Sequence, residues 1–525
     1  MKKRNVIFFV SMLLLIAGTG NAANEKRTDK PNVLFISVDD LNDWVSLLGK
    51  KGNVDIKTPN LDKLARRGVY FVNNHANTTA CSPSRLSVMT GMSAVSTGCY
   101  TNKSGVQNKQ LYDNVLPLPC YLRNNGYYTM GCGKIEGHAM TDFDKKHSDN
   151  KMWNERLPRS FRMNSTTFRD GGGYGGIDFY PFPIGGSGIK NYHPTYRGHS
   201  LCAGPIDRDY LPGGKMPDEI SAEWIIKRLK RNYDKPFFLG IGFVRPHVPY
   251  TAPREFFDMY PLNKIHAPAD PEGEMDDISL YGKAMAYGLF EPGDEFMVRE
   301  MGPDYRKKLV QGYMASVSFM DAQLGLVLDA LEESKYAKNT IIVLWSDHGQ
   351  HLGEKHSWRK QCLWQESTNC PMIWVVPNVA KAGAICKQPS SLLDIYPTLT
   401  ELCGLKKIEN QDGISLLSQI KNSDTKSLKP AITTWTYGSH SVRGERYHYI
   451  HYYDGSDELY DGENDFGEHN NLANDPNYVS VIKKMKKYLP KDIYKPTERN
   501  KEFYTYKKRA EQWKKDPESM PDWLK

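Results

Sequence analysis

Residues 32–40 read Asn-Val-Leu-Phe-Ile-Ser-Val-Asp-Asp, a nearly unbroken apolar run that ends in the pair Asp39-Asp40. A run of this kind is typical of a strand buried on both faces of a parallel sheet. Residues 237–244 and 340–345 form two more such runs, which lead into Arg245-Pro246-His247 and Ser346-Asp347-His348. Because ligands of open α/β sheets bind at the carboxyl ends of the strands, we expect these polar residues to share one site.

The segment 309–331 carries apolar residues about every 3.6 positions, which predicts an amphipathic helix packed on the sheet. Alternating strands and helices indicate an α/β fold. After about residue 421 the pattern changes to short segments typical of antiparallel strands, at 432–437, 447–453 and 458–461. We therefore predict a main domain over 23–425 and a smaller C-terminal α+β subdomain over 426–525.

The end of the C-terminal subdomain is predicted to contain one Lys-rich amphipathic helix, near 479–489. The tail that follows, from Pro490, has no clear pattern, and we expect it to be irregular. Trp513 and Trp523 are the side chains expected to anchor this tail.

The N-terminus differs in kind from the rest of the chain. Lys2, Lys3 and Arg4 precede an apolar run over 6–17 and then small residues, which is typical of a secretory signal peptide over 1–22. We expect a secreted or periplasmic protein with no membrane span after cleavage, because the run is too short for a comfortable bilayer crossing. A retained anchor is the alternative.

The composition narrows the class of protein. The 525 residues are 39% hydrophobic and 25% charged, which excludes disorder, collagen-like repetition and a transmembrane bundle for the bulk of the chain. The net charge is +8, and removal of 1–22 would delete three basic residues. This mild positive charge is compatible with a polyanionic substrate without requiring one. The sequence contains no nucleic-acid-binding motif.

Residues 80–91 read Ala-Cys-Ser-Pro-Ser-Arg-Leu-Ser-Val-Met-Thr-Gly. Pro83 and the residues after it place Cys81 at the N-terminus of a helix, where free N–H groups favour a bound anion. Nine cysteines are an odd count for an exported protein, so at least one is expected to be free or modified. A structural or disulfide role for Cys81 is the alternative.

This stretch resembles the C-x-P-S-R…T-G signature of the type I sulfatases, which belong to the alkaline phosphatase superfamily. In that family the Cys is oxidised after translation to formylglycine, whose hydrate attacks sulfur. The resemblance implies that Cys81 becomes the nucleophile and that Arg85 holds it and balances the sulfate. It also implies a maturation partner, either a formylglycine-generating or an anaerobic sulfatase-maturating enzyme.

The same family holds one calcium ion with an aspartate pair after the first strand, the formylglycine, and an Asp followed by Asn or His after a later strand. The resemblance therefore assigns as metal ligands Asp39, Asp40, Cys81, Asp347 and His348. Hard carboxylate oxygens suit calcium. A nitrogen ligand is unusual for calcium, which leaves another divalent ion open.

Two basic segments complete the resemblance before the third strand. Residues 133–138, Gly-Lys-Ile-Glu-Gly-His, resemble the family's G-K-x-x-H segment with one residue more. Lys134 is thereby expected to contact the sulfate, and His138 to orient the formylglycine hydroxyl, with His147 as a distant alternative. Residues 244–249, Val-Arg-Pro-His-Val-Pro, match P-H-x-P, so His247 is expected to protonate the leaving alcohol or bind the sulfate.

A last basic segment follows the third strand. Lys360 falls where the family has its second sulfate-binding Lys, and Lys355 is a near competitor. The motifs V-D-D-L-N-D, G-K-I and S-D-H-G-x-x-L-G-E most resemble the iduronate-2-sulfatase branch. Arg245 is the candidate for binding a uronate carboxylate through its forked guanidinium, or is a structural Arg.

The resemblance implies a large mixed, mostly parallel sheet flanked by helices, as in alkaline phosphatase, with the smaller C-terminal α+β subdomain. It implies a sulfatase that acts on a sulfated glycan or oligosaccharide. Two alternatives remain: a phosphate or phosphonate monoester hydrolase of the same superfamily, and a non-catalytic secreted glycan-binding protein.

Overall fold

A computed structural model describes residues 30–46, 55–102, 106, 108, 116–137, 140, 151–157, 201–269, 271–495 and 501–525. The predicted signal peptide lies outside the described residues. So does most of the Gly-rich region before residue 201.

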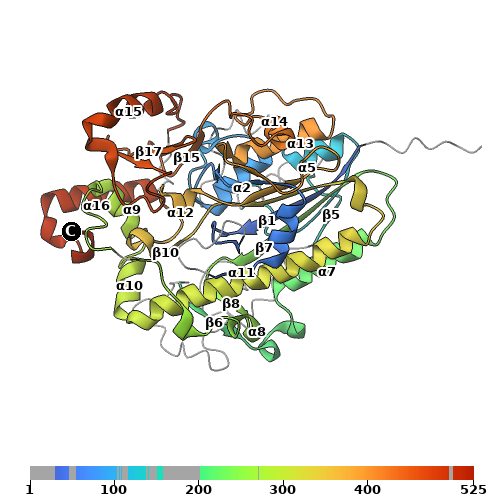
Figure 1. Cartoon of the computed structure of the whole chain (residues 1–525), viewed down its shortest axis with the longest axis horizontal. Coiled ribbons are helices and arrows are strands. Elements are labelled where there is room, and N and C mark those ends of the chain that lie inside the picture. The colour runs from blue at the N-terminus through green and yellow to red at the C-terminus, as the bar shows by residue number, and fades with distance from the viewer. Residues whose placement is uncertain are drawn as a thin grey trace, which may run out of the picture.

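A mixed sheet of eight strands forms the centre of the molecule (Figure 1). Its order is β13 (Ala384–Cys386), β2 (Val69–Phe71), β12 (Met372–Val375), β9 (Thr340–Ser346), β1 (Asn32–Asp39), β7 (Phe237–Pro246), β4 (Tyr128–Gly133) and β5 (Glu155–Arg156). The three predicted strands β9, β1 and β7 are parallel neighbours in the middle. β12 runs antiparallel to both of its neighbours, so the sheet is mixed and mostly parallel, as expected.

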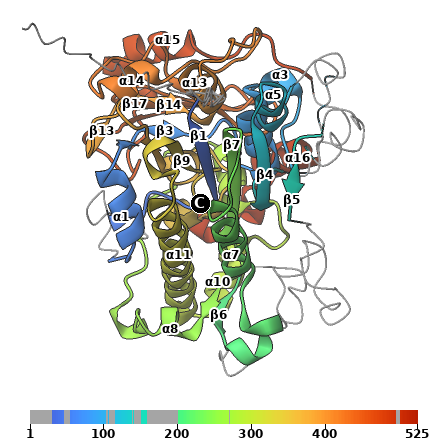
Figure 2. The same cartoon turned by 90° about the vertical axis from the view of Figure 1, so that its right-hand side faces the viewer.

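Helices cover both faces of this sheet (Figure 2). One face carries α1 (Pro59–Arg66), α7 (Pro217–Leu229) and α11 (Pro303–Glu332), and the other carries α2 (Cys81–Thr90), α5 (Leu118–Asn124) and α13 (Ile395–Leu402). The side chains of β1 alternate between two buried clusters: Leu34, Ile36 and Val38 pack on the α11 side, and Val33 and Phe35 on the other. This alternation explains why β1 is apolar at almost every position.

α11 contains the predicted amphipathic helix at 309–331 and extends it at both ends. Among the described residues, it is the one helix long and apolar enough to cross a membrane by length and composition. Most of it is buried against the sheet and against β8 (Tyr250–Pro253), so it serves as a core helix.

A second sheet lies beside the main one near the C-terminus (Figure 1). It is antiparallel, in the order β15 (Ala431–Thr434), β16 (His440–Arg443), β17 (Tyr447–His451) and β18 (Asp457–Asp461). Three of the strands correspond to predicted segments, whereas β16 lies in a stretch for which no strand was predicted. The Lys-rich helix is present as α15 (Val479–Lys486).

The prediction of an irregular tail after Pro490 is wrong, because residues Lys501–Lys515 form the helix α16. Its apolar side chains Phe503, Tyr506, Ala510 and Trp513 recur every three or four residues, and all four are buried. The last three share a buried cluster with α9 (Leu280–Tyr287), and Phe503 contacts the rings of Tyr437 and Tyr453. The expected anchoring is seen: Trp513 is buried, and Trp523 stacks on Tyr287 with 6.1 Å between ring centroids.

Short elements complete the described chain: β3 (Asn74–His75), α3 (Ala94–Thr97), β6 (Ala203–Ile206), α8 (Arg254–Phe257), α10 (Asp294–Glu300), β10 (His351–Leu352), β11 (Trp358–Arg359), α12 (Gln365–Thr368), β14 (Ser390–Ser391) and α14 (Leu417–Lys421). β10 and β11 pair in an antiparallel ribbon directly after β9. This ribbon returns the chain toward the carboxyl ends of the central strands.

Candidate active site

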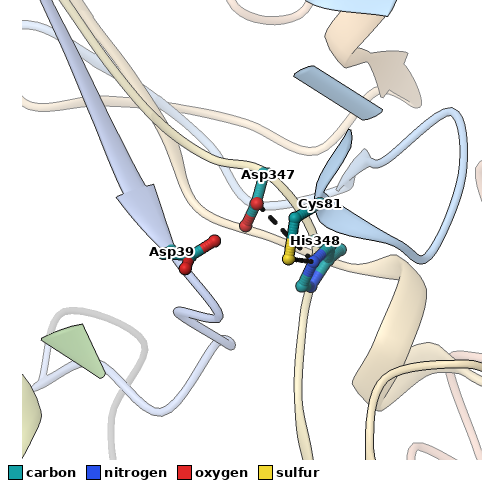
Figure 3. A group of neighbouring side chains, drawn as sticks. All are labelled: Asp39, Cys81, Asp347 and His348. Carbon is teal, nitrogen blue, oxygen red and sulfur yellow. Dashed lines mark hydrogen bonds and ion pairs between the residues drawn. The ribbon is translucent and has the colours of Figure 1, made fainter. Parts of the chain in front are cut away.

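The carboxyl ends of β1 and β9 and the N-terminus of α2 meet at one place (Figure 3). Asp39 is the last residue of β1, Asp347 and His348 follow β9, and Cys81 is the first residue of α2. The ligand-capable atoms of these four side chains all lie within 4.8 Å of one another. The structure thus brings together residues that are more than 300 positions apart in the sequence.

Arg85 links the ends of β1 and β9 through two ion pairs. It is fully buried, and its Nη2 lies 3.1 Å from Asp39 Oδ1 while its Nε lies 2.9 Å from Asp347 Oδ2. Because Arg85 is one helical turn after Cys81 on α2, these two ion pairs also fix the start of the helix against the sheet. Arg85 further donates to Ser37 Oγ at 3.0 Å.

Two lysines face the aspartate pair. Lys134 Nζ donates to Asp39 Oδ2, and Lys360 Nζ donates to both oxygens of Asp40, at 2.5 and 2.7 Å. Burial opposes ionisation of both carboxyl groups, but nearby positive charge outweighs it. Lys134 is the main cause that holds the pKa of Asp39 well below its usual value, and Lys360 is the main cause that lowers the pKa of Asp40. Both aspartates are therefore anionic at neutral pH.

Lys134 reaches Asp39 because the backbone of β4 comes very close to β7. Gly133 has φ +68°, and a Cβ there would lie 2.0 Å from the carbonyl oxygen of Gly242. The amide of Lys134 donates to that same carbonyl at 2.7 Å. Only glycine fits this position, so Gly133 is what allows Lys134 to turn into the site.

His247 lies just after β7, with Nε2 4.0 Å from Asp40 Oδ2. Its Nδ1 is 2.6 Å from the carbonyl oxygen of Val248, and since a carbonyl only accepts, Nδ1 carries the proton and Nε2 has a free lone pair. Burial, together with Lys134 and Lys360, lowers the pKa of His247 to about 3. The imidazole is neutral at pH 7.

Arg245 is only 2% exposed, and its guanidinium supports the backbone of His247. Nη1 of Arg245 donates to the carbonyl oxygen of His247 at 2.6 Å. The buried carboxylate of Asp218, on α7, accepts the backbone amides of Val244 and Arg245 at 2.8 and 2.9 Å. Arg245 and Asp218 together therefore hold the segment that presents His247.

The thiol of Cys81 is poorly suited to act as a nucleophile by itself. Cys81 is buried, and burial, reinforced by Asp39, raises the pKa of its thiol far above the usual value. Its Sγ lies 3.3 Å from His348 Nε2 (Figure 3). All nine cysteines are buried and none of them forms a disulfide bond, so the structure does not support a disulfide role for Cys81.

The donor set fits a divalent cation. Two overlapping groups of ligand atoms, each within 4.8 Å, are formed by Asp39, Cys81, Asp347 and His348 and by Asp39, Asp40, Cys81 and His247. His348 Nδ1 lies 3.0 Å from the carbonyl oxygen of Gly349, so Nδ1 carries a hydrogen, and Nε2 is the nitrogen that faces Asp40 and Asp347. Carboxylate oxygens with one imidazole nitrogen can hold a hard cation, and calcium is compatible with the oxygens.

Two of the predicted residues are not placed in the site. His138, like the alternative His147, lies outside the described residues. Lys355, the competitor of Lys360, is buried elsewhere, with its Nζ 3.0 Å from Glu274 Oε1. Of the two lysines, Lys360 alone touches the aspartate pair.

Sequence reasoning missed the residues that hold this site from behind: Ser37, Tyr313, Ser346 and Asp218. Ser37 and Ser346 lie within apolar strands, and Tyr313 lies on the apolar stripe of α11, where each reads as core. Asp218 is an ordinary acidic residue in the first turn of α7. Nothing in the local sequence separates these side chains from structural ones.

A mostly parallel sheet between two helical layers, with an anion-binding helix N-terminus and a metal-capable carboxylate cluster at its carboxyl edge, defines a hydrolase of the alkaline phosphatase-like class. The chain belongs to the sulfatase family, whose sequence profile matches residues 31–405. A second profile, that of the N-sulphoglucosamine sulphohydrolase C-terminal region, matches residues 353–495. The chain is therefore a sulfuric ester hydrolase.

Two sequence relatives and one solved structure illustrate the match. A sulfatase of Formosa agariphila is 37% identical over 477 residues, which cover 89% of this chain and 88% of that protein. Iduronate 2-sulfatase of Mus musculus is 31% identical over 431 residues, covering 74% and 71%. The phosphonate monoester hydrolase of Agrobacterium radiobacter superposes with a TM-score of 0.66 over 87% of this chain and 94% of that one, at 21% identity, which shows a common fold.

Proposed function

We propose that this protein is a secreted or periplasmic sulfatase that removes sulfate from a sulfated glycan, using a formylglycine made from Cys81 and one calcium ion. The observation that carries the proposal is the meeting of Cys81, at a helix N-terminus, with three aspartates and three basic side chains. Such a site balances a bound anion against fixed positive charge while leaving one residue free for covalent chemistry.

The residue at position 81 has to be modified for this chemistry. At neutral pH the buried thiol is protonated, and its Sγ is hydrogen-bonded to His348. Formylglycine supplies the nucleophilic oxygen that this thiol lacks. A formylglycine-generating or anaerobic sulfatase-maturating enzyme is the partner that this step requires.

Calcium, when bound, would supply positive charge against the sulfate oxygens. Asp39, Asp40, Asp347, His348 and the modified residue 81 are the side chains proposed to hold it. In the structure these side chains fall in two overlapping groups of ligand atoms that share Asp39 and Cys81.

The cationic side chains are proposed to stabilise the transition state. Lys134 and Lys360 reach the aspartate pair from two sides, so their ammonium groups can neutralise charge that develops on the sulfate and on the leaving oxygen. Arg85 has both of its ion pairs made within the protein, which favours a positioning role for this residue.

His247 is proposed to act at the leaving alcohol. Its neutral imidazole presents an unprotonated Nε2 at 4.0 Å from Asp40. Proton donation therefore requires that the bound sulfate ester raise the pKa of His247 from about 3, which an added negative charge does. Without that shift, Nε2 accepts a hydrogen bond from a hydroxyl group.

A sulfated glycan is the substrate class that fits best. The similarity to iduronate 2-sulfatase supports a sulfated uronate, and Arg245 is the proposed contact for its carboxylate. In the structure Arg245 donates one hydrogen bond to His247, while its buried Nε has no protein partner. A substrate carboxylate would therefore have to bind the nitrogen atoms of Arg245 other than Nη1, which donates to His247.

The test is release of inorganic sulfate by protein whose residue 81 is verified as formylglycine by mass spectrometry. The substrates are disaccharides that differ only in sulfate position and in the presence of a uronate carboxylate. Release from a 2-sulfated uronate supports the full proposal. Release only from neutral sulfated sugars keeps the mechanism and removes Arg245 from substrate binding, and no release from any of them contradicts the proposed substrate class.

Hydrolysis of a phosphonate or phosphate monoester is a second candidate activity of the same site, suggested by the fold shared with the Agrobacterium enzyme. Measuring phosphate and sulfate release from paired esters of one alcohol separates the two activities. A non-catalytic glycan-binding protein is disfavoured by membership of an enzyme family, and would show tight binding without turnover.

A further inference from the structure

Asp40 has an unusual backbone conformation for a residue with a side chain. Its φ is +62°, in the left-handed region, directly after the end of β1. Aspartate tolerates this region better than most residues, but the conformation still costs on the order of 1 kcal/mol. The turn is needed because it directs the Asp40 carboxylate to Lys360 while Asp39 still faces Arg85.

One hydroxyl group is hydrogen-bonded to the backbone on both sides of this turn. Tyr313, on α11, donates from Oη to the carbonyl oxygen of Asp40 at 2.9 Å and accepts the backbone amide of Asn42 at 2.9 Å. The two bonds bridge the residues on either side of Leu41. Both backbone groups are buried, so removal of the hydroxyl would leave a donor and an acceptor without these partners.

The Tyr313 ring is itself held in place. It is completely buried and makes edge-on contacts with Trp44 and Tyr250, with ring centroids 6.0 and 5.5 Å apart. Burial raises the pKa of the phenol, so the hydroxyl keeps the proton that it donates to Asp40. Because these contacts fix the ring, its hydroxyl group offers the turn at Asp40 a fixed hydrogen-bonding partner.

The turn also connects to the other carboxylate of the site. The amide of Asp40 donates to Asp347 Oδ1 at 3.1 Å, and the amide of Leu41 donates to Ser346 Oγ at 3.0 Å. A change in the turn therefore alters the position of Asp40 and the hydrogen bonding of Asp347 together.

We propose that Tyr313 is a positioning residue for the cation site: its hydroxyl holds the strained turn at Asp40 so that the Asp40 carboxylate points at the cation and at Lys360. The inference rests on the proposed calcium-dependent function. The hydroxyl of Tyr313 uses its hydrogen bonds on the backbone of Asp40 and Asn42, so Tyr313 acts through this turn. Outer partners of metal ligands are typically worth 10- to 100-fold in metal affinity or activity.

The variant that tests this is Tyr313→Phe, which removes the hydroxyl and keeps the ring. Tyr305→Phe is its matched control, since Tyr305 is buried on the same helix and donates to the carbonyl oxygen of Leu201 at 3.0 Å. Calcium is titrated calorimetrically into chelator-stripped protein carrying formylglycine, and kcat is measured over a range of calcium concentrations.

We expect calcium affinity to fall about tenfold in Tyr313→Phe and to stay unchanged in Tyr305→Phe. The kcat of Tyr313→Phe should be low at limiting calcium and recover at saturating calcium. Circular dichroism at each calcium concentration should show the same folded fraction in Tyr313→Phe and the parent, so that the recovery reflects ion binding and not refolding. In an Asp40→Asn background, the further effect of Tyr313→Phe on calcium affinity should be smaller than in the parent, because the part that depends on the Asp40 carboxylate is lost and only the part that reaches Asp347 through the turn remains.

Equal calcium affinity in Tyr313→Phe and the parent would overturn the inference and leave the proposed function intact. So would a Tyr313→Phe protein that unfolds in the chelator while Tyr305→Phe stays folded, because the hydroxyl would then serve folding alone. If the parent protein itself binds no calcium, the proposed calcium-dependent mechanism fails and the inference fails with it.

Discussion

Lys360 and Lys355 provide a decisive comparison, because both are buried lysines paired with a buried carboxylate and only one faces the cation site. Lys360 Nζ lies 2.5 Å from Asp40 Oδ1, and Lys355 Nζ lies 3.0 Å from Glu274 Oε1. Replacing each lysine in turn with methionine keeps the length of the side chain and removes its charge. We expect similar losses of stability and very different losses of turnover.

The size of each effect follows from the contacts. Removing one partner of a buried ion pair costs about 3–5 kcal/mol. Both variants should fall in this range, because each leaves a buried carboxylate without its ammonium partner. Losing a preorganised group that stabilises transition-state charge costs about 10²- to 10³-fold in kcat, so we expect this loss for Lys360→Met alone.

The assay measures sulfate release at saturating substrate and calcium, at a temperature where both variants are folded by circular dichroism. Rates are divided by the fraction of active formylglycine protein, and stability is measured by urea unfolding. The reasoning is refuted if Lys355→Met loses as much kcat as Lys360→Met. It is also refuted if Lys360→Met keeps kcat within about threefold of the parent, since its ammonium would then not act on the reaction.

Three further outcomes are expected. Cys81→Ala should fold and release no sulfate from any ester; full activity in this variant would exclude position 81 as the nucleophile. His440 has a pKa lowered by burial to about 3, so its neutral form stabilises the fold above pH 6.5 and this contribution is lost as the pH falls toward 3. Urea unfolding of His440→Gln should therefore show a pH dependence between 6.5 and 4 that is shallower by up to about 1.4 kcal/mol per pH unit, and an equal slope in both proteins contradicts the shift. Trp513→Ala on α16 should destabilise the protein by about 3–5 kcal/mol in thermal unfolding, whereas Tyr504→Ala, at a half-exposed position of the same helix, should stay within about 0.5 kcal/mol, and equal effects would mean that α16 does not pack as described.

The central strands and α11 could be predicted because each leaves its own pattern in the sequence. A strand buried on both faces is apolar at almost every position, whereas a helix packed on a sheet is apolar about every 3.6 residues. β1 has Val33 and Phe35 in one core cluster and Leu34 and Ile36 in the other, so its sequence is apolar throughout. The C-terminal helix α16 was missed although its buried apolar residues are spaced for a helix, because the charged run over 507–509 interrupts this stripe in the sequence. β16 was missed because it is short and polar, with His440, Ser441 and Arg443 all buried by tertiary contacts.

Arg245 shows the limit of a motif. Its position before Pro246-His247 left two predictions open, a contact with a uronate or a structural role, and one end of its guanidinium is hydrogen-bonded to the backbone of His247. The hydrogen-bond acceptors that a buried guanidinium finds within the protein are set by its neighbours in the folded structure, and a local motif does not reveal them.

The sequence by itself determined the class of chemistry, because a cysteine in a C-x-P-S-R motif and aspartates at strand ends are local patterns with few alternative uses. Only the tertiary structure decided which lysine faces Asp40, that the Cys81 thiol is buried and protonated, and that Tyr313 closes the turn at Asp40. The physical reason is that motifs are read along the chain. Hydrogen bonds, ion pairs and pKa values depend instead on atoms that folding brings within a few ångströms across separations such as the 273 residues between Asp40 and Tyr313.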